Sequence, residues 1–172
     1  MKFYFRKIAN ADGALPIHGD VDVSAAVKGR KDIVAVSPIK ADLNALPAGT
    51  DRVSVAGKLH GEVDMLCARC LNPVKTHLDI PFAETFRWTK QAAEPAEEEE
   101  DEERIDVSEE MVDLEPYVEE SFLLHLPLSV LCADDCRGLC PTCGSNLNEG
   151  GCDCDNVVID PRLAGLKDFF KN

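Results

Sequence analysis

The chain lacks a membrane-spanning segment, because its 172 residues contain no run of 18 consecutive apolar side chains. Its first stretch, "MKFYFRKIANADGALP", also lacks the apolar core and the small-residue cleavage site of a signal peptide. We therefore expect a cytoplasmic protein whose thiols stay reduced. Aromatic residues are few, at 6%, and the hydrophobic content is ordinary, at 45%. A length of 172 residues is enough for one domain with a core, or for one domain plus an appendage.

Basic residues are scarce, with 18 Lys and Arg against 32 Asp and Glu and a formal net charge of −14. The segment 94–120 holds fifteen of the acids and a single base, Arg104, so the rest of the chain is neutral. Such a chain lacks the basic surface of a direct nucleic-acid binder. The acidic segment is either a solvated linker or an arm that attracts basic partners.

Motifs of the common enzyme classes are missing. The sequence has no Walker-type loop, no GxGxxG and no nucleophile elbow. The four histidines are far apart in sequence and are expected to be surface or packing residues: His18, His60, His77 and His125. We therefore expect a protein that is not an enzyme.

The first half of the chain, residues 1–90, shows the apolar–polar alternation of half-buried strands. Five segments carry it: "KFYFRKI", "VDVSAAV", "DIVAVSPIKADL", "DRVSVAGKLHGEVDMLC" and "VKTHLDIPFAETF". Bends or a bulge are expected at Gly57 and Gly61. In the last segment, every second side chain is predicted to face the core: Val74, Thr76, Leu78, Ile80 and Phe82.

An acidic flexible loop is expected at 91–110, and helices are expected on either side of a cysteine-rich segment. A long helix in "DLEPYVEESFLLHLPL" would begin after a cap at Asp113 and end before Pro127. Its apolar stripe comprises Leu114, Val118, Phe122 and His125. A short C-terminal helix from Asp160 would bury Leu163, Leu166, Phe169 and Phe170 against the body or a partner. We predict an α+β fold with a β-rich N-terminal sheet, in which 1–90 and 111–172 form one composite domain.

The most distinctive feature of the sequence is its eight cysteines. Two lie in "CARC", at a turn between two predicted strands, and six lie in "CADDCRGLCPTCGSNLNEGGCDC", residues 132–154. Zinc takes four thiolates in a tetrahedron, and paired cysteines on tight turns provide them. The spacing favours one local site, made of Cys140, Cys143, Cys152 and Cys154. The remaining Cys67, Cys70, Cys132 and Cys136 would form a long-range second site.

A different partition remains open, in which residues 132–143 provide one set of four thiols. The other set would then be Cys67, Cys70, Cys152 and Cys154. Disulfides and redox or iron–sulfur chemistry are further alternatives. Arg69 and Arg137 flank the long-range site, where they would either offset thiolate charge or contact a phosphate. Four protein ligands on each ion leave no open position, so we expect two structural zinc ions.

The order of these motifs resembles the YceD family of bacteria and plastids. The resemblance covers roughly residues 55–170 and is carried by "CARCLNPV", the acidic gap, the segment from "DLEPYVEESF" to "GGCDC", and "DPRLAGLKDF". The family is associated with accumulation of large-subunit ribosomal RNA. Some members keep the equivalents of the long-range site and lack the local one. The resemblance assigns no catalytic residue.

The function expected from these features is a non-enzymatic, zinc-binding factor in ribosome biogenesis. Its partner would be pre-ribosomal large-subunit RNA or a basic ribosomal protein. Two alternatives remain: a redox switch that releases zinc on oxidation, and a zinc-ribbon module that binds nucleic acid. The second would need clustered bases, and residues 132–154 contain only Arg137.

Overall fold

A computed structural model describes residues 1–89 and 104–155 of the chain. Six strands form the main sheet: β2 (Leu15–Val21), β3 (Ile33–Val36), β4 (Ile39–Pro47), β5 (Arg52–Leu66), β6 (Pro73–Trp88) and β7 (Ile105–Val107). β1 (Lys2–Tyr4) and β8 (Met111–Asp113) pair as a separate ribbon. The helices are α1 (Phe5–Ala9) and α2 (Glu115–His125). The sheet-rich α+β class is thus confirmed.

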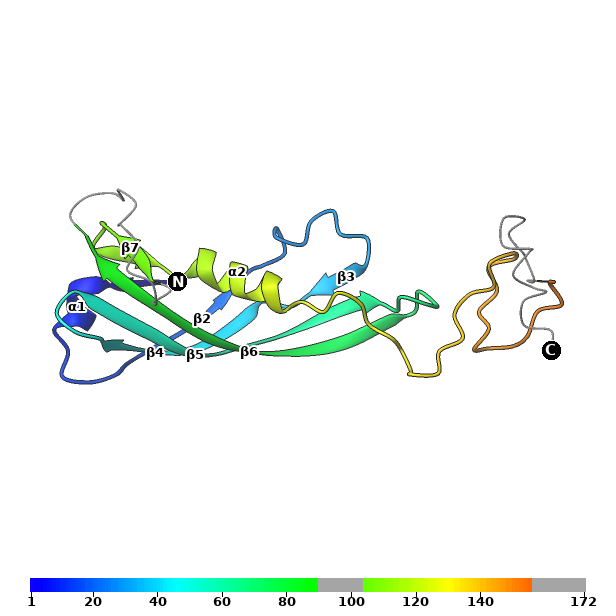
Figure 1. Cartoon of the computed structure of the whole chain (residues 1–172), viewed down its shortest axis with the longest axis horizontal. Coiled ribbons are helices and arrows are strands. Elements are labelled where there is room, and N and C mark those ends of the chain that lie inside the picture. Colours follow the sequence, from blue (N-terminus) through cyan, green and yellow to red (C-terminus); the bar gives the residue numbers. More distant parts are fainter. Residues whose placement is uncertain (90–103, 156–172) are drawn as a thin grey trace, which may run out of the picture.

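The β5–β6 hairpin is the backbone of the fold. Its antiparallel register runs without a shift from Arg52 opposite Arg87 to Leu66 opposite Pro73. On the other edge of β5, β4 and β3 follow one another, with Ser37 and Pro38 between them. The hairpin extends toward the cysteine-rich part of the chain, at one end of an elongated molecule (Figure 1). Because the hairpin is long, its tip lies beyond the hydrophobic core of the sheet (Figure 1).

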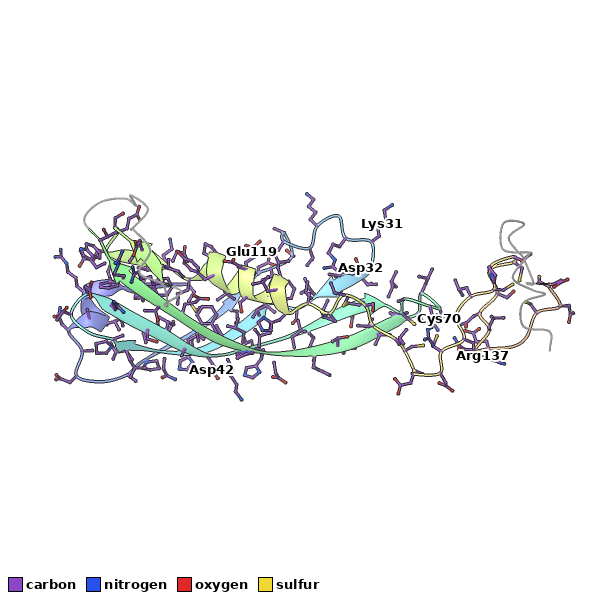
Figure 2. The ribbon with its side chains drawn as sticks, viewed as in Figure 1. Lys31, Asp32, Asp42, Cys70, Glu119 and Arg137 are labelled. Carbon is purple, nitrogen blue, oxygen red and sulfur yellow. The ribbon has the colours of Figure 1, made fainter. Side chains whose placement is uncertain are left out.

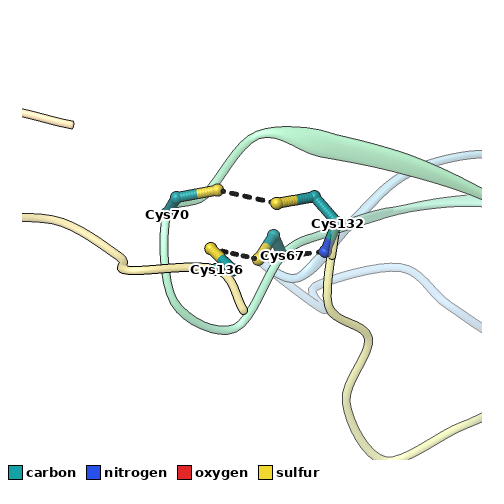
Figure 3. Close-up of side chains that lie close together, drawn as sticks. All are labelled: Cys67, Cys70, Cys132 and Cys136. Carbon is teal, nitrogen blue, oxygen red and sulfur yellow. Dashed lines mark hydrogen bonds between the residues drawn. The ribbon is translucent and has the colours of Figure 1, made fainter. Parts of the chain in front are cut away.

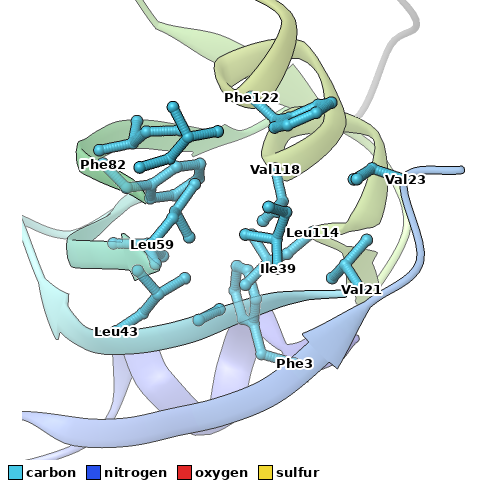
Figure 4. Packing of buried hydrophobic residues seen from close by; sticks show 14 of the residues in the cluster. Phe3, Val21, Val23, Ile39, Leu43, Leu59, Phe82, Leu114, Val118 and Phe122 are labelled. Carbon is cyan, nitrogen blue, oxygen red and sulfur yellow. The ribbon is translucent and has the colours of Figure 1, made fainter. Parts of the chain in front are cut away.

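The core lies between one face of this sheet and α2, which runs along that face (Figures 1 and 4). The side chains of Leu114, Val118 and Phe122 are fully buried. They face sheet residues such as Ile39 and Phe82 (Figure 4). Three members of the predicted helix stripe are therefore confirmed.

The helix differs from the prediction in its length and in one stripe residue. α2 has 11 residues, so the expected long helix is wrong. It ends because Leu126 precedes Pro127 and takes an extended conformation, with ψ at 130°. His125 is exposed, and its Nδ1 contacts the Ser121 carbonyl oxygen at 2.9 Å. At the start, Asp113 Oδ1 accepts the Glu115 N–H at 3.1 Å, while Leu114 occupies the N-cap position.

Several predicted strands are shorter or differently placed. In "KFYFRKI" only Lys2–Tyr4 is a strand, because Phe5 and Ile8, three positions apart, are buried from the short helix α1. In "VDVSAAV" only Val21 belongs to a strand, and the following residues form turns that still bury Val23 and Val27. A bulge at Gly57 or Gly61 is wrong, since β5 pairs with β6 through both residues without a shift in register.

The predicted acidic loop contains a strand. Residues Ile105–Val107 form β7, which pairs in parallel with Phe86–Trp88 at the end of β6. Arg87 and Asp106 reinforce this pairing through two hydrogen bonds of 2.7 Å. The rest of the acidic run, 90–103, and the predicted C-terminal helix lie outside the described residues. Among residues 1–89 and 104–155, no helix is long and apolar enough to cross a membrane.

Candidate metal centres

The eight cysteines gather in two groups of four. Site one comprises Cys67, Cys70, Cys132 and Cys136, and site two comprises Cys140, Cys143, Cys152 and Cys154. In each group all four sulfur atoms lie within 4.8 Å of one another, and every one of these cysteines is free of disulfide bonds. This grouping matches the first partition expected from spacing and not the alternative one.

The tip of the β5–β6 hairpin provides half of site one. Cys67 donates its N–H to the Asn72 carbonyl oxygen at 2.8 Å. The Cys67 carbonyl oxygen accepts the Leu71 N–H at 3.0 Å. Leu71 has a left-handed conformation, with φ at 60°, which closes the turn. The turn places Cys67 and Cys70 together, both buried.

The chain that leaves α2 provides the other half. Val130 forms a parallel bridge with Cys67, and its carbonyl oxygen accepts the Ala68 N–H at 2.9 Å. This contact delivers Cys132, whose N–H donates to Cys67 Sγ at 3.4 Å (Figure 3). Site one therefore ties the hairpin tip to a segment more than sixty residues later in the chain.

The sulfur positions fit a four-thiolate metal ion. The Sγ atoms of Cys70 and Cys132 are 3.5 Å apart, and those of Cys67 and Cys136 are 3.8 Å apart (Figure 3). In a tetrahedron with metal–sulfur bonds of about 2.3 Å, sulfur atoms lie about 3.8 Å apart. The residues present can therefore hold a metal ion at site one without rearrangement of the backbone.

Arg69, between the two cysteines of the hairpin tip, secures the second half of site one. Its Nη1 donates to the carbonyl oxygens of Cys136 at 2.8 Å and Asp134 at 3.3 Å. Its own carbonyl oxygen accepts the Leu139 N–H at 3.2 Å. Arg69 thus acts locally on the loop. Arg137 is exposed, and within the described chain only its backbone N–H has a hydrogen-bond partner, the Asn148 side chain.

Site two is a compact hairpin built on "CPTCG". The Cys140 carbonyl oxygen accepts the Gly144 N–H at 2.8 Å, and Gly144 has a φ of 76°, which favours glycine. Cys140 donates its N–H to the Ser145 carbonyl oxygen at 2.8 Å, and the Ser145 hydroxyl lies 3.1 Å from Cys143 Sγ. Cys152 and Cys154 complete the group.

Hydrogen bonds divide the thiols of each group into acidic and weakly acidic members. The backbone N–H of Cys70 lowers the pKa of Cys67 to about 6, and that of Cys143 does the same for Cys140. Cys132 shares its proton with the Cys70 sulfur, and this raises its pKa to about 12. A cation bound by all four sulfurs must displace such protons, so binding releases protons.

Asn148, on the spacer of site two, connects the two groups. Its Nδ2 donates to Cys136 Sγ at 3.4 Å, and its Oδ1 accepts the Arg137 N–H at 2.7 Å. Asn146 Oδ1 accepts bonds from both nitrogens of Asn148, at 2.9 and 3.0 Å, which fixes the orientation of the amide. A side chain from one site therefore orients a sulfur of the other. Spacing alone indicated only a tight reversal here.

The variant Asn148→Ala is expected to speed metal transfer from site one to a chromogenic chelator by about tenfold, because the outer partners of a ligand contribute about 10–100-fold to metal affinity. Stopped-flow absorbance would measure the rate. Asn44→Ala, an exposed amide on β4, is the matched control. Equal rates in Asn148→Ala and in the unmodified chain would contradict a role for this bond.

The histidines do not join either cysteine group. Three of them lie on the sheet face opposite α2, each beside a carboxylate on the neighbouring strand. His60 Nδ1 is 2.6 Å from Asp79, His77 Nδ1 is 3.2 Å from Glu62, and His18 contacts Asp42. Figure 2 shows Asp42 on this outer face and Glu119 on the opposite side, on α2. All three are surface residues, as expected.

The described residues therefore define a sheet-rich α+β protein with two four-cysteine groups, one of them linking the hairpin to the segment after α2. The chain belongs to the YceD family. The family described as "Large ribosomal RNA subunit accumulation protein YceD" matches residues 55–170, which include both groups.

Relatives of this chain occur in several bacteria. An uncharacterized protein of Mycobacterium tuberculosis (strain H37Rv) is 36% identical over 122 residues, covering 70% of this chain and 57% of that protein. A Mycobacterium leprae protein is 32% identical over 135 residues, covering 78% and 60%. The protein YlbN of Bacillus subtilis is 26% identical over 152 residues, covering 88% and 85%. The chain spans less than two thirds of the mycobacterial relatives' length. No solved structure matches it.

Proposed function

We propose that the protein is a non-enzymatic zinc-binding factor of ribosome biogenesis, which acts in the cytoplasm. It supports accumulation of large-subunit ribosomal RNA by binding a component of the pre-ribosome. The observation that carries this proposal is the YceD family match, which spans the hairpin tip and both four-cysteine groups. The family's description refers to large-subunit ribosomal RNA.

Zinc is the metal that the donor set favours. All eight donors are thiols, and four thiolates per ion satisfy tetrahedral zinc completely. Such an ion has no open position for water or substrate, which supports a structural role. Zinc at site one would hold the hairpin tip against the chain that leaves α2, and thereby shape a binding surface without taking part in a reaction.

The charge distribution favours a basic ribosomal protein as the direct partner. Residues 94–120 carry fifteen carboxylates and one arginine, and the remainder of the chain is neutral. Complementary charge accelerates the encounter with a basic protein, whereas phosphate backbones are repelled by such a segment. Bare precursor RNA is the less favoured partner.

The test is sedimentation of the tagged full chain from native lysate through a density gradient, at low and moderate salt. We expect comigration with large-subunit precursors that weakens at moderate salt, because exposed charges are screened. Replacing the eight acids of residues 94–103 with Gln keeps the length and is expected to reduce comigration severalfold at low salt.

The control is a chain with Asp12→Asn and Asp20→Asn, which neutralises two exposed carboxylates outside residues 94–120. Migration of the unmodified chain only as a small free protein would overturn the ribosomal assignment. Unchanged comigration of the Gln variant would refute only the contribution of the acidic run.

A further inference from the structure

A groove of about 710 Å³ lies between the edge of the sheet and the helix, on the side away from β5. Its apolar lining comes from Pro81 and Ala83 of β6, Ile105 of β7, and Tyr117 and Leu124 of α2. β6 pairs with β7 only at Phe86–Trp88, so no described strand covers the earlier part of this edge. Among residues 1–89 and 104–155, nothing covers the groove, and we consider it as a surface for a partner.

Leu124 is the feature that a solvated helix surface does not explain. It is 76% exposed, although the same helix buries Val118 and Phe122 completely. The preceding residue, Leu123, is 41% exposed, so two leucines at the end of α2 face outward. Apolar side chains beside an open groove are typical of a surface that a partner covers.

The rim of the groove is acidic. Besides Tyr117, its titratable lining comprises Glu84 of β6, Glu120 and His125 of α2, and Arg104, so carboxylates balance the arginine and exceed it by one. Partial burial of Tyr117 raises its pKa, and the negative charges of Glu84 and Glu120 raise it further. From Arg104 to His125 the chain carries seven carboxylates and one arginine. An apolar floor within an acidic face selects a partner that offers both apolar and basic side chains.

The edge of β6 limits how that partner binds. Pro81 has no backbone N–H and so removes a donor from the strand that borders the groove. Proline at a sheet edge disfavours the addition of another strand. The occupant must therefore be held mainly through side chains, with an apolar anchor against Leu124 and Tyr117 and basic groups near the rim.

We infer that this groove is the docking site for a Lys/Arg-rich protein segment with apolar anchors. The segment would belong to the basic ribosomal protein that the proposed function favours as partner. The inference rests on that function for the nature of the partner, but the groove itself is defined by geometry. RNA is the less favoured occupant, since its phosphates would lie near Glu84 and Glu120.

The experiment is photo-crosslinking of the full chain in cells, with Leu124→p-benzoylphenylalanine and a control at Leu46, a 41% exposed leucine of β4 outside the groove. Mass spectrometry would identify the crosslinked peptide. We expect a Lys/Arg-rich segment of a protein, captured from position 124 and not from 46. The segment, made as a labelled peptide, is expected to bind Leu124→Ser about tenfold more weakly than the unmodified chain, because buried anchors dominate such affinities. Leu46→Ser should stay within about twofold.

Three results would overturn the inference: crosslinks to RNA, crosslinks to residues of this chain, or no capture above the Leu46 control. The gradient experiment separates this failure from that of the proposed function. If comigration with large-subunit precursors persists unchanged in Leu124→Ser, the groove is wrong and the ribosomal assignment stands.

Discussion

Replacing Cys136 with serine is expected to reduce zinc from about two ions to about one per chain, and to lower the Tm by roughly 6–20 °C. Cys136 is buried, and its sulfur lies 3.8 Å from that of Cys67. Serine is a poor ligand for zinc beside three thiolates, so the ion would be lost. Elemental analysis and calorimetry would measure the two effects.

The thermal effect is large because site one closes a long loop. It joins the tip of the β5–β6 hairpin to the chain after α2, and removing such a crosslink costs roughly 3–5 kcal/mol of unfolding free energy. For a chain of this length, each kcal/mol lowers the Tm by about 2–4 °C. The variant also leaves the buried Cys67 and Cys70 without their common ion.

Cys154→Ser is the matched control, since it removes one thiol from site two. That site closes within residues 140–154 and does not tie α2 to the hairpin. We expect loss of the other ion with a Tm decrease less than half that of Cys136→Ser. Retention of two ions by Cys136→Ser would show that site one does not bind zinc through this residue, and equal Tm decreases would contradict the crosslink argument.

Sequence patterns predicted the fold best where one face of a strand is buried and the other is solvated. β6 shows this alternation from Leu78 to Phe82, and the expected core residues there are buried. The prediction failed for Val23 and Val27, which are buried from turns, because burial of a valine does not require a strand. It also missed β7, since a three-residue strand beside an acidic run carries too little apolar pattern to detect.

The membership of the two cysteine groups followed from spacing, because a local set of four within fifteen residues leaves the others as one set. The contacts that hold the two groups in place could not be predicted from the spacing of the cysteines. The bridge between Val130 and Cys67 pairs residues far apart in sequence, and the Arg69 side chain bonds to backbone carbonyls. Asn148 bonds to a thiol of the neighbouring site. Such contacts depend on tertiary geometry that composition does not encode.

Gly57→Ala is expected to destabilise the sheet by roughly 3 kcal/mol or more, because the new methyl group would overlap the backbone of the neighbouring strand. A Cβ at this position would lie 2.1 Å from the Asp42 carbonyl oxygen and 2.8 Å from the Leu43 Cα. Both belong to β4, which pairs with β5 at this point, so neither can move without breaking the register. Urea unfolding followed by circular dichroism would measure the change.

Two other glycines make the test quantitative. At Gly61 a Cβ would meet the side-chain tip of Ile39 at 2.4 Å, and a side chain can shift more easily than backbone, so Gly61→Ala should cost less than Gly57→Ala. Gly13 has no atom within 4 Å of such a Cβ, and Gly13→Ala should change stability by no more than about 0.5 kcal/mol. The expected order of destabilisation is therefore Gly57, Gly61, Gly13. A Gly57→Ala chain as stable as Gly13→Ala would mean that β4 and β5 do not approach one another as closely as this register requires.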